Sequence, residues 1–359
     1  MFSIEMLPAV EGDALWVEYG DPAGPHRILI DCGYKSTYRA VMERLRADPQ
    51  LDFELFVLTH IDRDHIAGAV PFVADGDVTP ERVRQVWFNG REQIDDSLGA
   101  REAEYFTRNL ERRGFSWNTD FGGGPVVVPD TGPAEAMHLS GGMRLTVLSP
   151  GRAQLENLFE EWESKLEDIL KGRTLETLLE ETPAALQPDV LGAPDVRQLS
   201  ASAFETDDEP PNGSSIAFLA EYIDPFDGDR EKAALFTGDC FSPILEQSLL
   251  KLLDERETDR LRLDAFKISH HGSKGNTSSD LLDLIRCRHF LFSTNGNRHK
   301  HPDPECVARV IASQDGPIDL HFNYRSPFNE MWRLPNLQRQ HRFEAHYPPA
   351  GEKGLTVVF

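Results

Sequence analysis

The segment THIDRDHIAG, at residues 59–68, holds several side chains of the types that bind metal ions. His60, Asp62, Asp64 and His65 lie within six residues, directly after an apolar run that predicts a buried strand. Loops after strands are where α/β folds hold their sites. Burying two histidines and two aspartates without a cation would be costly. The segment therefore predicts ligands for two adjacent metals, with His60 and Asp62 on one side and Asp64 and His65 on the other.

Two later segments place further candidate ligands at the ends of predicted strands. In LFTGDC, Asp239 follows a glycine that admits close backbone approach, and its two carboxylate oxygens can bridge two cations. In FKISHHGSKGNTS, His270 and His271 precede a Gly-Ser turn. Because adjacent residues at a strand end point in opposite directions, we expect His270 to bind metal and His271 to lie behind it or against the substrate.

The elements that must position these residues follow from hydrophobic patterning. Apolar runs predict strands at 14–19, 27–33, 54–60, 82–90, 125–130, 143–151, 214–222, 232–239, 264–272 and 289–296. Helical spacing predicts helices at 38–47, 155–181, 244–255, 278–286 and 304–313. The alternation of strands with helices in the second half is typical of the α/β class.

Residues 151–210 differ in composition from the rest of the chain. They hold 15 acidic and 5 basic residues, a net charge of -10. A helical pattern is followed by a stretch rich in proline, serine and acidic residues. We expect an insertion between two strands, which serves as a solvated cap, as a lid over the site, or as a docking surface for a protein partner.

The composition excludes several classes of protein. With 37 basic and 60 acidic residues among 359, the formal net charge is -23, which excludes a generally basic nucleic-acid coat protein but not a local basic groove. No apolar run reaches a membrane-spanning length, and the first residues lack the pattern of a signal peptide, so we expect a cytoplasmic protein without a membrane segment. The four cysteines form no CxxC pair, which argues against a thiol zinc site.

The order of these motifs resembles the metallo-β-lactamase fold superfamily. Within it, the closer resemblance is to the soluble β-lactamase-like domain of ComEC-type competence proteins, carried by THIDRDHIAG, NGSSIAFL, LFTGD, DAFKISHHGSKGNTS and STNGNRHKHPDPECVARVI. The resemblance implies a four-layer αββα sandwich with a two-metal site at one edge. The membrane channel has no counterpart here, so we expect a stand-alone single domain over 1–359. The acidic insertion occupies 151–210, and 314–359 form a C-terminal extension packed on the domain.

The sequence departs from the superfamily's HxHxDH motif. Asp62 stands where the second histidine is expected, as in the competence-type branch. The histidine expected before the TGD strand is also missing. Asn212 is the nearest polar candidate, and the alternative, His138, precedes the wrong strand and fits a surface position.

These departures make the expected ligand sets rich in oxygen. One metal would be held by His60, Asp62, Asp239 and Asn212, and the other by Asp64, His65, Asp239 and His270. Carboxylate and amide oxygens suit Mn²⁺, while imidazole suits Zn²⁺, so both metals remain open. Two such metals, about 3.5–4 Å apart, would hold a bridging hydroxide as the nucleophile, with Asp64 among the catalytic residues.

The resemblance favours a phosphodiester, such as nucleic acid, as the substrate. Ser273 and Lys274 in GSKGNTS, together with backbone N–H groups, offer an anion cradle, and Ser215 in NGSS is a further contact to substrate or ligands. In the loop at 295–302, the predicted substrate contacts are Asn295, Arg298 and Lys300, and His301 is the predicted proton donor to the leaving oxygen.

Charge distribution also favours an anionic substrate, because residues 286–346 hold nine basic and six acidic residues. Aromatic residues interleaved with Arg and His after residue 320 suit either base stacking or the edge of a core. Two alternatives stay open: hydrolysis of a small ester, lactone or thioester, and a regulatory or defence effector that docks a protein partner through 151–210.

Overall fold

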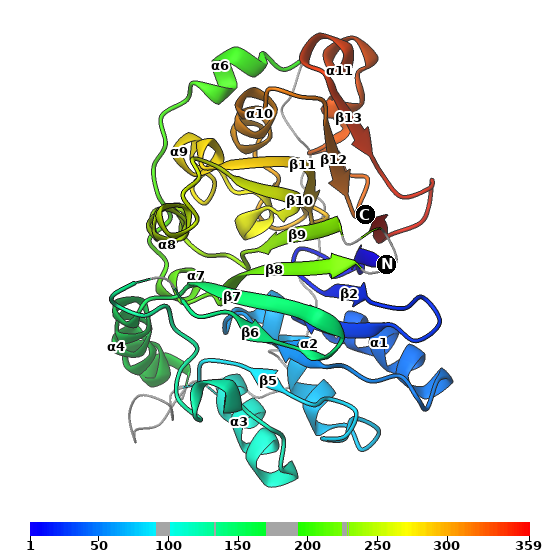
Figure 1. Ribbon diagram of the computed structural model, residues 1–359, viewed down its shortest axis with the longest axis vertical. Helices are drawn as coiled ribbons and strands as arrows, with labels where there is room; N and C mark the ends of the chain where they lie inside the picture. The colour runs from blue at the N-terminus through cyan, green and yellow to red at the C-terminus, as the bar shows by residue number, and fades with distance from the viewer. Residues whose placement is uncertain (91–100, 133, 170–192, 225–227, 229) are drawn as a thin grey trace.

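The computed structural model describes residues 1–90, 101–132, 134–169, 193–224, 228 and 230–359. Two β-sheets pack face to face, and helices cover the outer face of each sheet (Figure 1). This four-layer arrangement confirms the predicted αββα sandwich.

The first sheet has six strands in the order β14-β1-β2-β3-β4-β5. Its strands are β1 (Phe2–Met6), β2 (Leu15–Tyr19), β3 (His26–Ile30), β4 (Leu55–Val57), β5 (Val86–Trp87) and β14 (Leu355–Val358). The strands predicted at 14–19 and 27–33 are present as β2 and β3, which pair antiparallel as a hairpin. Strands β3, β4 and β5 then run parallel, so their carboxyl ends lie at one edge.

The second sheet has eight strands in the order β13-β12-β11-β10-β9-β8-β7-β6. Its strands are β6 (Met137–His138), β7 (Met143–Ser149), β8 (Ala217–Asp224), β9 (Arg230–Phe236), β10 (Leu261–Lys267), β11 (Ile285–Phe292), β12 (Ile318–Phe322) and β13 (Phe343–His346). Strands β9 to β13 are parallel to one another. The loops that follow β9, β10 and β11 therefore leave the sheet at the same edge.

The described helices are α1 (Lys35–Ala47), α2 (Arg63–Ala74), α3 (Arg101–Arg113), α4 (Arg152–Ile169), α6 (Val196–Ser200), α7 (Pro210–Gly213), α8 (Ser242–Glu255), α9 (Ser279–Asp283), α10 (Pro304–Ser313) and α11 (Pro335–His341). The helix predicted at 304–313 matches α10 in both bounds. The helix predicted at 155–181 is present as α4, and its part beyond 169 lies outside the described residues.

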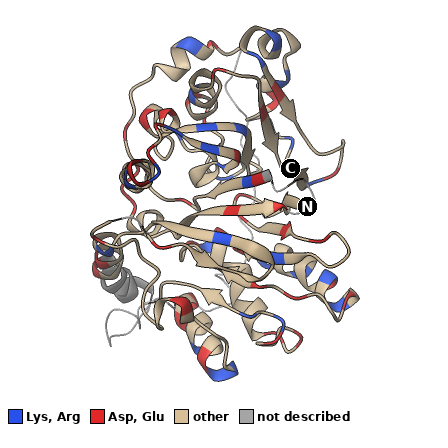
Figure 2. Cartoon of the chain, viewed as in Figure 1, with Lys and Arg blue, Asp and Glu red and all other residues tan. Residues whose placement is uncertain are grey.

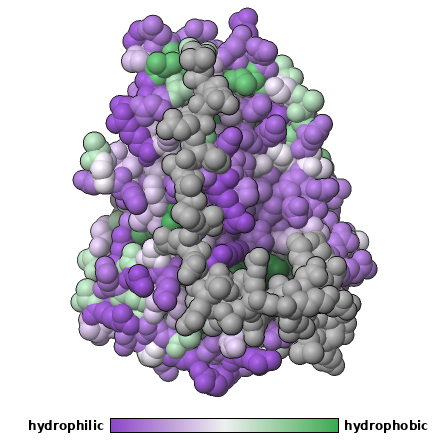
Figure 3. All heavy atoms as spheres, turned by 180° about the vertical axis from the view of Figure 1, so that it is seen from behind, coloured by the Kyte–Doolittle hydropathy of each residue, from purple (hydrophilic) through white to green (hydrophobic). Residues whose placement is uncertain are grey.

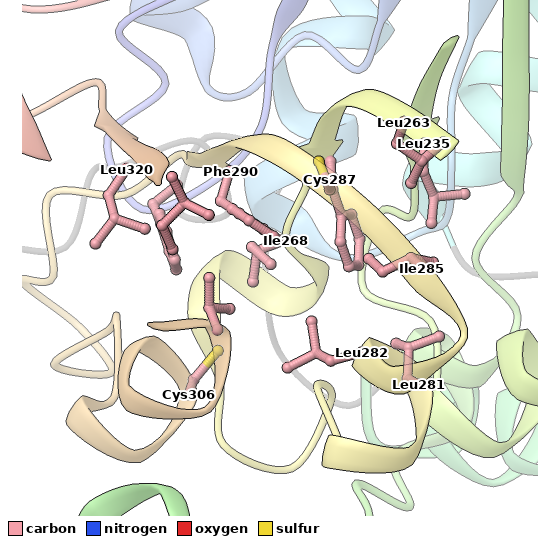
Figure 4. Packing of buried hydrophobic residues seen from close by; sticks show 14 of the residues in the cluster. Leu235, Leu263, Ile268, Leu281, Leu282, Ile285, Cys287, Phe290, Cys306 and Leu320 are labelled. Carbon is pink, nitrogen blue, oxygen red and sulfur yellow. The ribbon is translucent and has the colours of Figure 1, made fainter. Parts of the chain in front are cut away.

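Three apolar clusters fill the spaces between the four layers. One lies between the sheets and includes Val17 and Phe218. A second lies between the first sheet and helices α1 to α4. The third lies between the second sheet and α8 to α10, where Leu282 and Cys306 face Phe290 and Leu320 of the strands (Figure 4). The surface on the far side from Figure 1 is mostly hydrophilic where its residues are described (Figure 3).

Residues 314–359 contribute to both sheets. They supply β12 and β13 to the second sheet, and β14 pairs with β1 of the first. The aromatic residues of this segment are largely core, since Phe322, Trp332 and Phe343 are buried. The base-stacking alternative for these residues is therefore wrong.

The strand predicted at 125–130 is also wrong. Val126 and Val128 are buried as their apolar character predicts, yet the backbone there forms no strand. The side chain of Asn89 accepts from the Val126 N–H at 2.8 Å and donates to the Val126 carbonyl at 2.9 Å. A side-chain amide thus takes the place of a neighbouring strand.

Candidate metal centre

The candidate site forms where strands of the two sheets end at a common edge. His60 follows β4, Asp62 precedes α2, and Asp64 and His65 lie in its first turn. Asp239 follows β9 of the second sheet. The backbone N–H of Ile216 donates to the Thr59 carbonyl at 2.9 Å, which ties the two sheets together beside the site.

Four imidazole rings converge on one carboxylate oxygen, Oδ2 of Asp239. The distances from this oxygen to the ring Nε2 atoms are 3.7 Å for His60, 3.5 Å for His65, 3.8 Å for His270 and 3.4 Å for His271. Asp239 is buried, and the backbone N–H of Asp239 donates to the hydroxyl of Ser215 at 3.1 Å. Ser215 thus lies behind Asp239 and fixes its backbone.

Each ring is oriented through its other nitrogen, Nδ1. The Nδ1 partners are Thr59 Oγ1 for His60 at 3.0 Å, Asp31 Oδ2 for His65 at 2.7 Å, Asp207 Oδ2 for His270 at 3.2 Å, and the Ser293 carbonyl for His271 at 3.0 Å. Such partners fix the tautomer of a metal-binding histidine and leave Nε2 free to coordinate.

Asp62 and Asp64 divide the cluster into two halves. Asp62 Oδ2 lies 3.8 Å from the Nε2 of His60. Asp64 Oδ2 lies 3.4 Å from the Nε2 of His271 and 3.9 Å from that of His65. Asp239 is shared between the halves, as expected for a bridging carboxylate.

The expectation that His270 and His271 point in opposite directions is wrong. The two residues are not in extended strand but in a 3-10 turn, Ser269–Gly272, with φ angles of 47° and 54°. Gly272 follows at φ 93°, where a Cβ would come within 2.6 Å of Pro302. Left-handed backbone at consecutive residues is strained and is found mostly at functional sites. Here it brings both rings to Asp239, with His271 beside Asp64 and His65.

The charges of the cluster are strongly coupled. Burial alone would raise the pKa of Asp239, but His271, His65 and His270 hold it well below its usual range. Burial opposes protonation of His271 and His65, yet the facing carboxylates raise the pKa of both rings well above the usual range. The buried carboxylates therefore require compensating positive charge, which divalent cations held by these residues would supply.

Several buried atoms at the centre lack a hydrogen-bond partner among the described residues, His60 Nε2 and Asp239 Oδ1 among them. Burial and the neighbouring His65 lower the pKa of His60 to about 3, which keeps the ring neutral. The Thr59 hydroxyl donates to Asp31, so its oxygen accepts from His60 Nδ1 and Nε2 is left as the acceptor. Buried polar atoms without a partner are rare and need an explanation. The donor set therefore fits divalent cations.

Three carboxylates near the centre are not among the residues predicted from the sequence. Asp31 holds His65, and Asp207 holds His270. Asp13 lies 3.5 Å from His271 Nδ1 and 2.6 Å from the buried ammonium of Lys267. Asp13, His65, Asp239 and His271 form one compact group of candidate ligand atoms. A signal existed only for Asp31, which follows the apolar run RILI at a strand end.

Asn212 is buried, and its side-chain oxygen has no hydrogen-bond partner among the described residues, so its role as a metal ligand stays a prediction. Asn212 Nδ2 donates to Asp207 Oδ2 at 2.7 Å, so it supports the residue that orients His270. His138 is exposed on β6, the strand at one end of the second sheet, as its alternative surface interpretation predicts.

The backbone N–H groups predicted to form an anion cradle are engaged within the protein. The N–H of Lys274 donates to Asp303 Oδ2 at 2.8 Å, and that of Gly275 to the Ser273 hydroxyl at 3.2 Å. The backbone part of the cradle prediction is therefore wrong. The side chain of Lys274 remains exposed and available for an anion.

The loop at 295–302 lies beside the centre. The rings of His301 and His270 are 5.5 Å apart, and Arg298 and Lys300 are exposed. The backbone N–H of Asn295 donates to the Val10 carbonyl at 2.8 Å, which anchors the loop. Burial lowers the pKa of His301, which disfavours its predicted role as a proton donor at neutral pH.

Most of the basic excess of residues 286–346 lies away from the centre. Arg286 and Arg288 lie at the start of β11, the opposite end from the site. Arg309 is buried and donates to the carbonyls of Lys274 and Thr277, so it braces the loop after β10. The basic excess of 286–346, which favoured an anionic substrate in the sequence analysis, is therefore not concentrated at the site loops.

A family model of the metallo-beta-lactamase superfamily matches residues 14–146. The match includes His60 to His65, while Asp239 and the two adjacent histidines lie beyond it. The four-layer fold agrees with the sandwich of this superfamily, and the buried Asp/His group agrees with binding of divalent metal.

No curated protein matches the chain in sequence. The resemblance to the ComEC-type branch stays a prediction. Among the described residues, no helix is both long and apolar enough to cross a membrane.

Proposed function

We propose that this protein is a dinuclear metal-dependent hydrolase that cleaves phosphodiester bonds. The observation that carries the proposal is the convergence of four imidazole Nε2 atoms on Asp239 Oδ2, all between 3.4 and 3.8 Å. The superfamily match supports metal-dependent hydrolysis in general. The number of metals and the phosphodiester substrate are our inference.

The two halves of the cluster supply one metal site each. His60, Asp62 and His270 would hold one ion, Asp64, His65 and His271 the other, and Asp239 would bridge them. This assignment differs from the sequence prediction, which gave Asn212 to the first ion and His270 to the second. Here His270 joins the first site, and His271 takes its place at the second. Divalent metals bound in this way lower the pKa of a coordinated water towards neutrality and polarise a phosphoryl oxygen.

The protein's own contribution is to hold the ligands ready. Asp31 and Asp207 orient the imidazoles of His65 and His270, and Ser215 fixes the backbone of Asp239. With Nδ1 held in this way, the Nε2 atoms of His65 and His270 face Asp239, where the metals would be bound. With three carboxylates and four imidazoles around the centre, both Mn²⁺ and Zn²⁺ suit the donor set.

Exposed cations at the rim support an anionic substrate. Lys274, Arg298 and Lys300 are exposed on the two loops that flank His270 and His301. Arginine and lysine side chains bind phosphate oxygens through charge-assisted hydrogen bonds. Because these cations are few, we infer a short or single-stranded substrate, with contact to only a small number of phosphates.

Assays of the purified protein loaded with Mn²⁺, Mg²⁺ or Zn²⁺ test this proposal. The substrates are a small-molecule phosphodiester, single- and double-stranded DNA and RNA, and a panel of lactones and thioesters. We expect phosphodiester cleavage, with a higher KM in Arg298→Ala and Lys300→Ala and an unchanged kcat. Arg46→Ala, in the last turn of α1, is the matched control and should leave KM unchanged. Turnover confined to lactones or thioesters would overturn the proposal.

A further inference from the structure

A cavity lies at the opposite end of the parallel strands from the metal centre. It measures about 420 Å³ and is lined by residues that begin β10, β11 and β12. Strand β10 runs from this cavity, at Arg262, to the metal centre, at Lys267. Five residues of strand span roughly 17 Å, so the cavity is separate from the catalytic cluster.

The cavity is basic although the protein is strongly acidic. Its lining includes five basic residues against two acidic ones. These charged residues are Lys232, Arg260, Arg262, Arg286 and Arg288, with Asp264 and Asp315. Figure 2 shows Lys and Arg gathered on β10 and β11.

Two of the arginines are placed directly against each other. Arg262 of β10 and Arg286 of β11 are register partners on adjacent parallel strands, and both are exposed. Like charges on directly neighbouring strands destabilise a sheet. Within the described part of the chain, neither arginine has an acidic partner, in a protein with 60 acidic residues available.

The neighbouring arginines are paired, which isolates these two. Arg260 lies 3.8 Å from Asp315, and Arg288 lies 2.9 Å from Asp319. Arg262 and Arg286 therefore supply the uncompensated charge of the cavity. A guanidinium pair of this kind suits phosphate oxygens, which each planar fork can bind in a bidentate manner.

We propose that this cavity binds a small ligand that carries a pyrophosphate or triphosphate group. Its volume lies within the range of roughly 300–1,000 Å³ typical of small-molecule sites. Phe359 and His289 also line it, with ring centroids 5.3 Å apart, and offer aromatic faces for the group that bears the phosphates. The proposal does not rest on the proposed hydrolase activity, because none of these residues belongs to the metal centre.

The test measures ligand-induced stabilisation and binding of the full chain by thermal unfolding and calorimetry. The probes are inorganic pyrophosphate, ADP and AMP at constant ionic strength. In the wild type we expect pyrophosphate and ADP to raise Tm and AMP to do so far less. The double variant Arg262→Gln/Arg286→Gln should lose at least tenfold in affinity for both. Without ligand, its Tm should equal or exceed that of the wild type, because the repulsion is removed.

Two controls separate this site from others. Arg39→Gln removes an exposed arginine of α1 and should bind pyrophosphate as the wild type does. Pyrophosphate could also bind to metal ions at the metal centre. Asp239→Asn disables that centre and should still be stabilised by ADP. Equal Tm shifts in the wild type and the double variant would overturn the proposal. Loss of the shift in Asp239→Asn, or binding of an oligothymidylate but not pyrophosphate, would overturn it as well.

Discussion

Asp62 is the residue where this chain departs most clearly from the superfamily's histidine-rich motif. Limited hydration and the nearby carboxylates of Asp64 and Asp239 raise the pKa of Asp62 to about 7, which a bound cation would reverse. We predict that Mn²⁺ supports activity in the wild type at least as well as Zn²⁺ does. Asp62→His should shift the preference towards Zn²⁺, measured as kcat/KM with each metal. A wild type that is active only with Zn²⁺ and inhibited by Mn²⁺ would contradict this.

Asp31 is predicted to act through His65 and not on the substrate. Its Oδ2 lies 2.7 Å from His65 Nδ1, and it also accepts from the N–H and hydroxyl of Thr59. Asp31→Asn keeps the shape but removes the charge, so metal affinity should fall by about 10- to 100-fold. Metal titration measures this loss, and Asp21→Asn, in an exposed turn, should show none. An unchanged affinity in Asp31→Asn would rule out the positioning role.

At this scale the sequence predicts what is local and misses what is distant. The HIDRDH segment and the strand-end Asp239 can be recognised because their chemistry is concentrated within a few residues. Asp207 and Asp13 cannot be recognised in the sequence, because only the folded chain brings these distant segments to the site. The prediction for His270 and His271 is wrong because it assumes the alternating side-chain directions of a strand, whereas both residues have left-handed backbone.

The element that links the core to the site is β10. Its last residue, Lys267, is buried and lies 2.6 Å from Asp13. Removing one partner of a buried ion pair costs roughly 3–5 kcal/mol because the other charge is left uncompensated. Lys267→Met should therefore lower the free energy of unfolding by about this amount, measured by denaturant titration. The double variant Asp13→Asn/Lys267→Met should recover part of the lost free energy of unfolding. If it recovers none, the uncompensated charge of Asp13 is not the cause of the loss.

The same ion pair predicts a pH dependence. Burial opposes ionisation of Asp13, but Lys267 and His271 outweigh it and lower its pKa to about 2. A lowered folded-state pKa gives stability that is present above about pH 4 and lost as the pH falls towards 2. The stability difference between the wild type and Asp13→Asn should shrink over this interval.

Elements were predictable where apolar runs are long and local. The α10 helix and the strands near β7 to β11 follow from periodicity alone. The short strands β12, β13 and β14 were not predicted, although β12, with the sequence IDLHF, carries the alternating pattern of a strand. At four or five residues each, they are short enough to be overlooked without their pairing partners.

At the scale of the whole molecule, the acidic insertion meets the metal centre at its C-terminal end. Asp207 holds His270, and Leu155, Leu158 and Phe159 of α4 are buried in a core cluster. Removal of 151–210 would therefore damage both the core and the site. Point substitutions are needed to test whether this segment acts as a lid over the site. Glu205, Asp208 and Glu209 are exposed beside Asp207.

We predict that these three acids repel anionic substrates. The variant Glu205→Gln/Asp208→Asn/Glu209→Gln should bind single-stranded DNA faster at low salt, and the gain should disappear at high salt. Stopped-flow association rates against ionic strength measure this effect. The matched control, Asp21→Asn/Glu43→Gln/Asp48→Asn, removes equal charge from exposed positions on the first-sheet side. Equal gains in both variants would show that only net charge matters, not a gate at the site.

The central claim is that the histidine cluster around Asp239 binds two divalent metals for hydrolysis. Metal analysis of the wild type and Asp239→Asn, with phosphodiester cleavage measured on the same samples, tests it most directly. The wild type should hold two metal ions per chain. Asp239→Asn should lose at least one ion and nearly all activity, while its circular dichroism spectrum stays that of the folded protein. Full metal occupancy in folded Asp239→Asn would contradict the account.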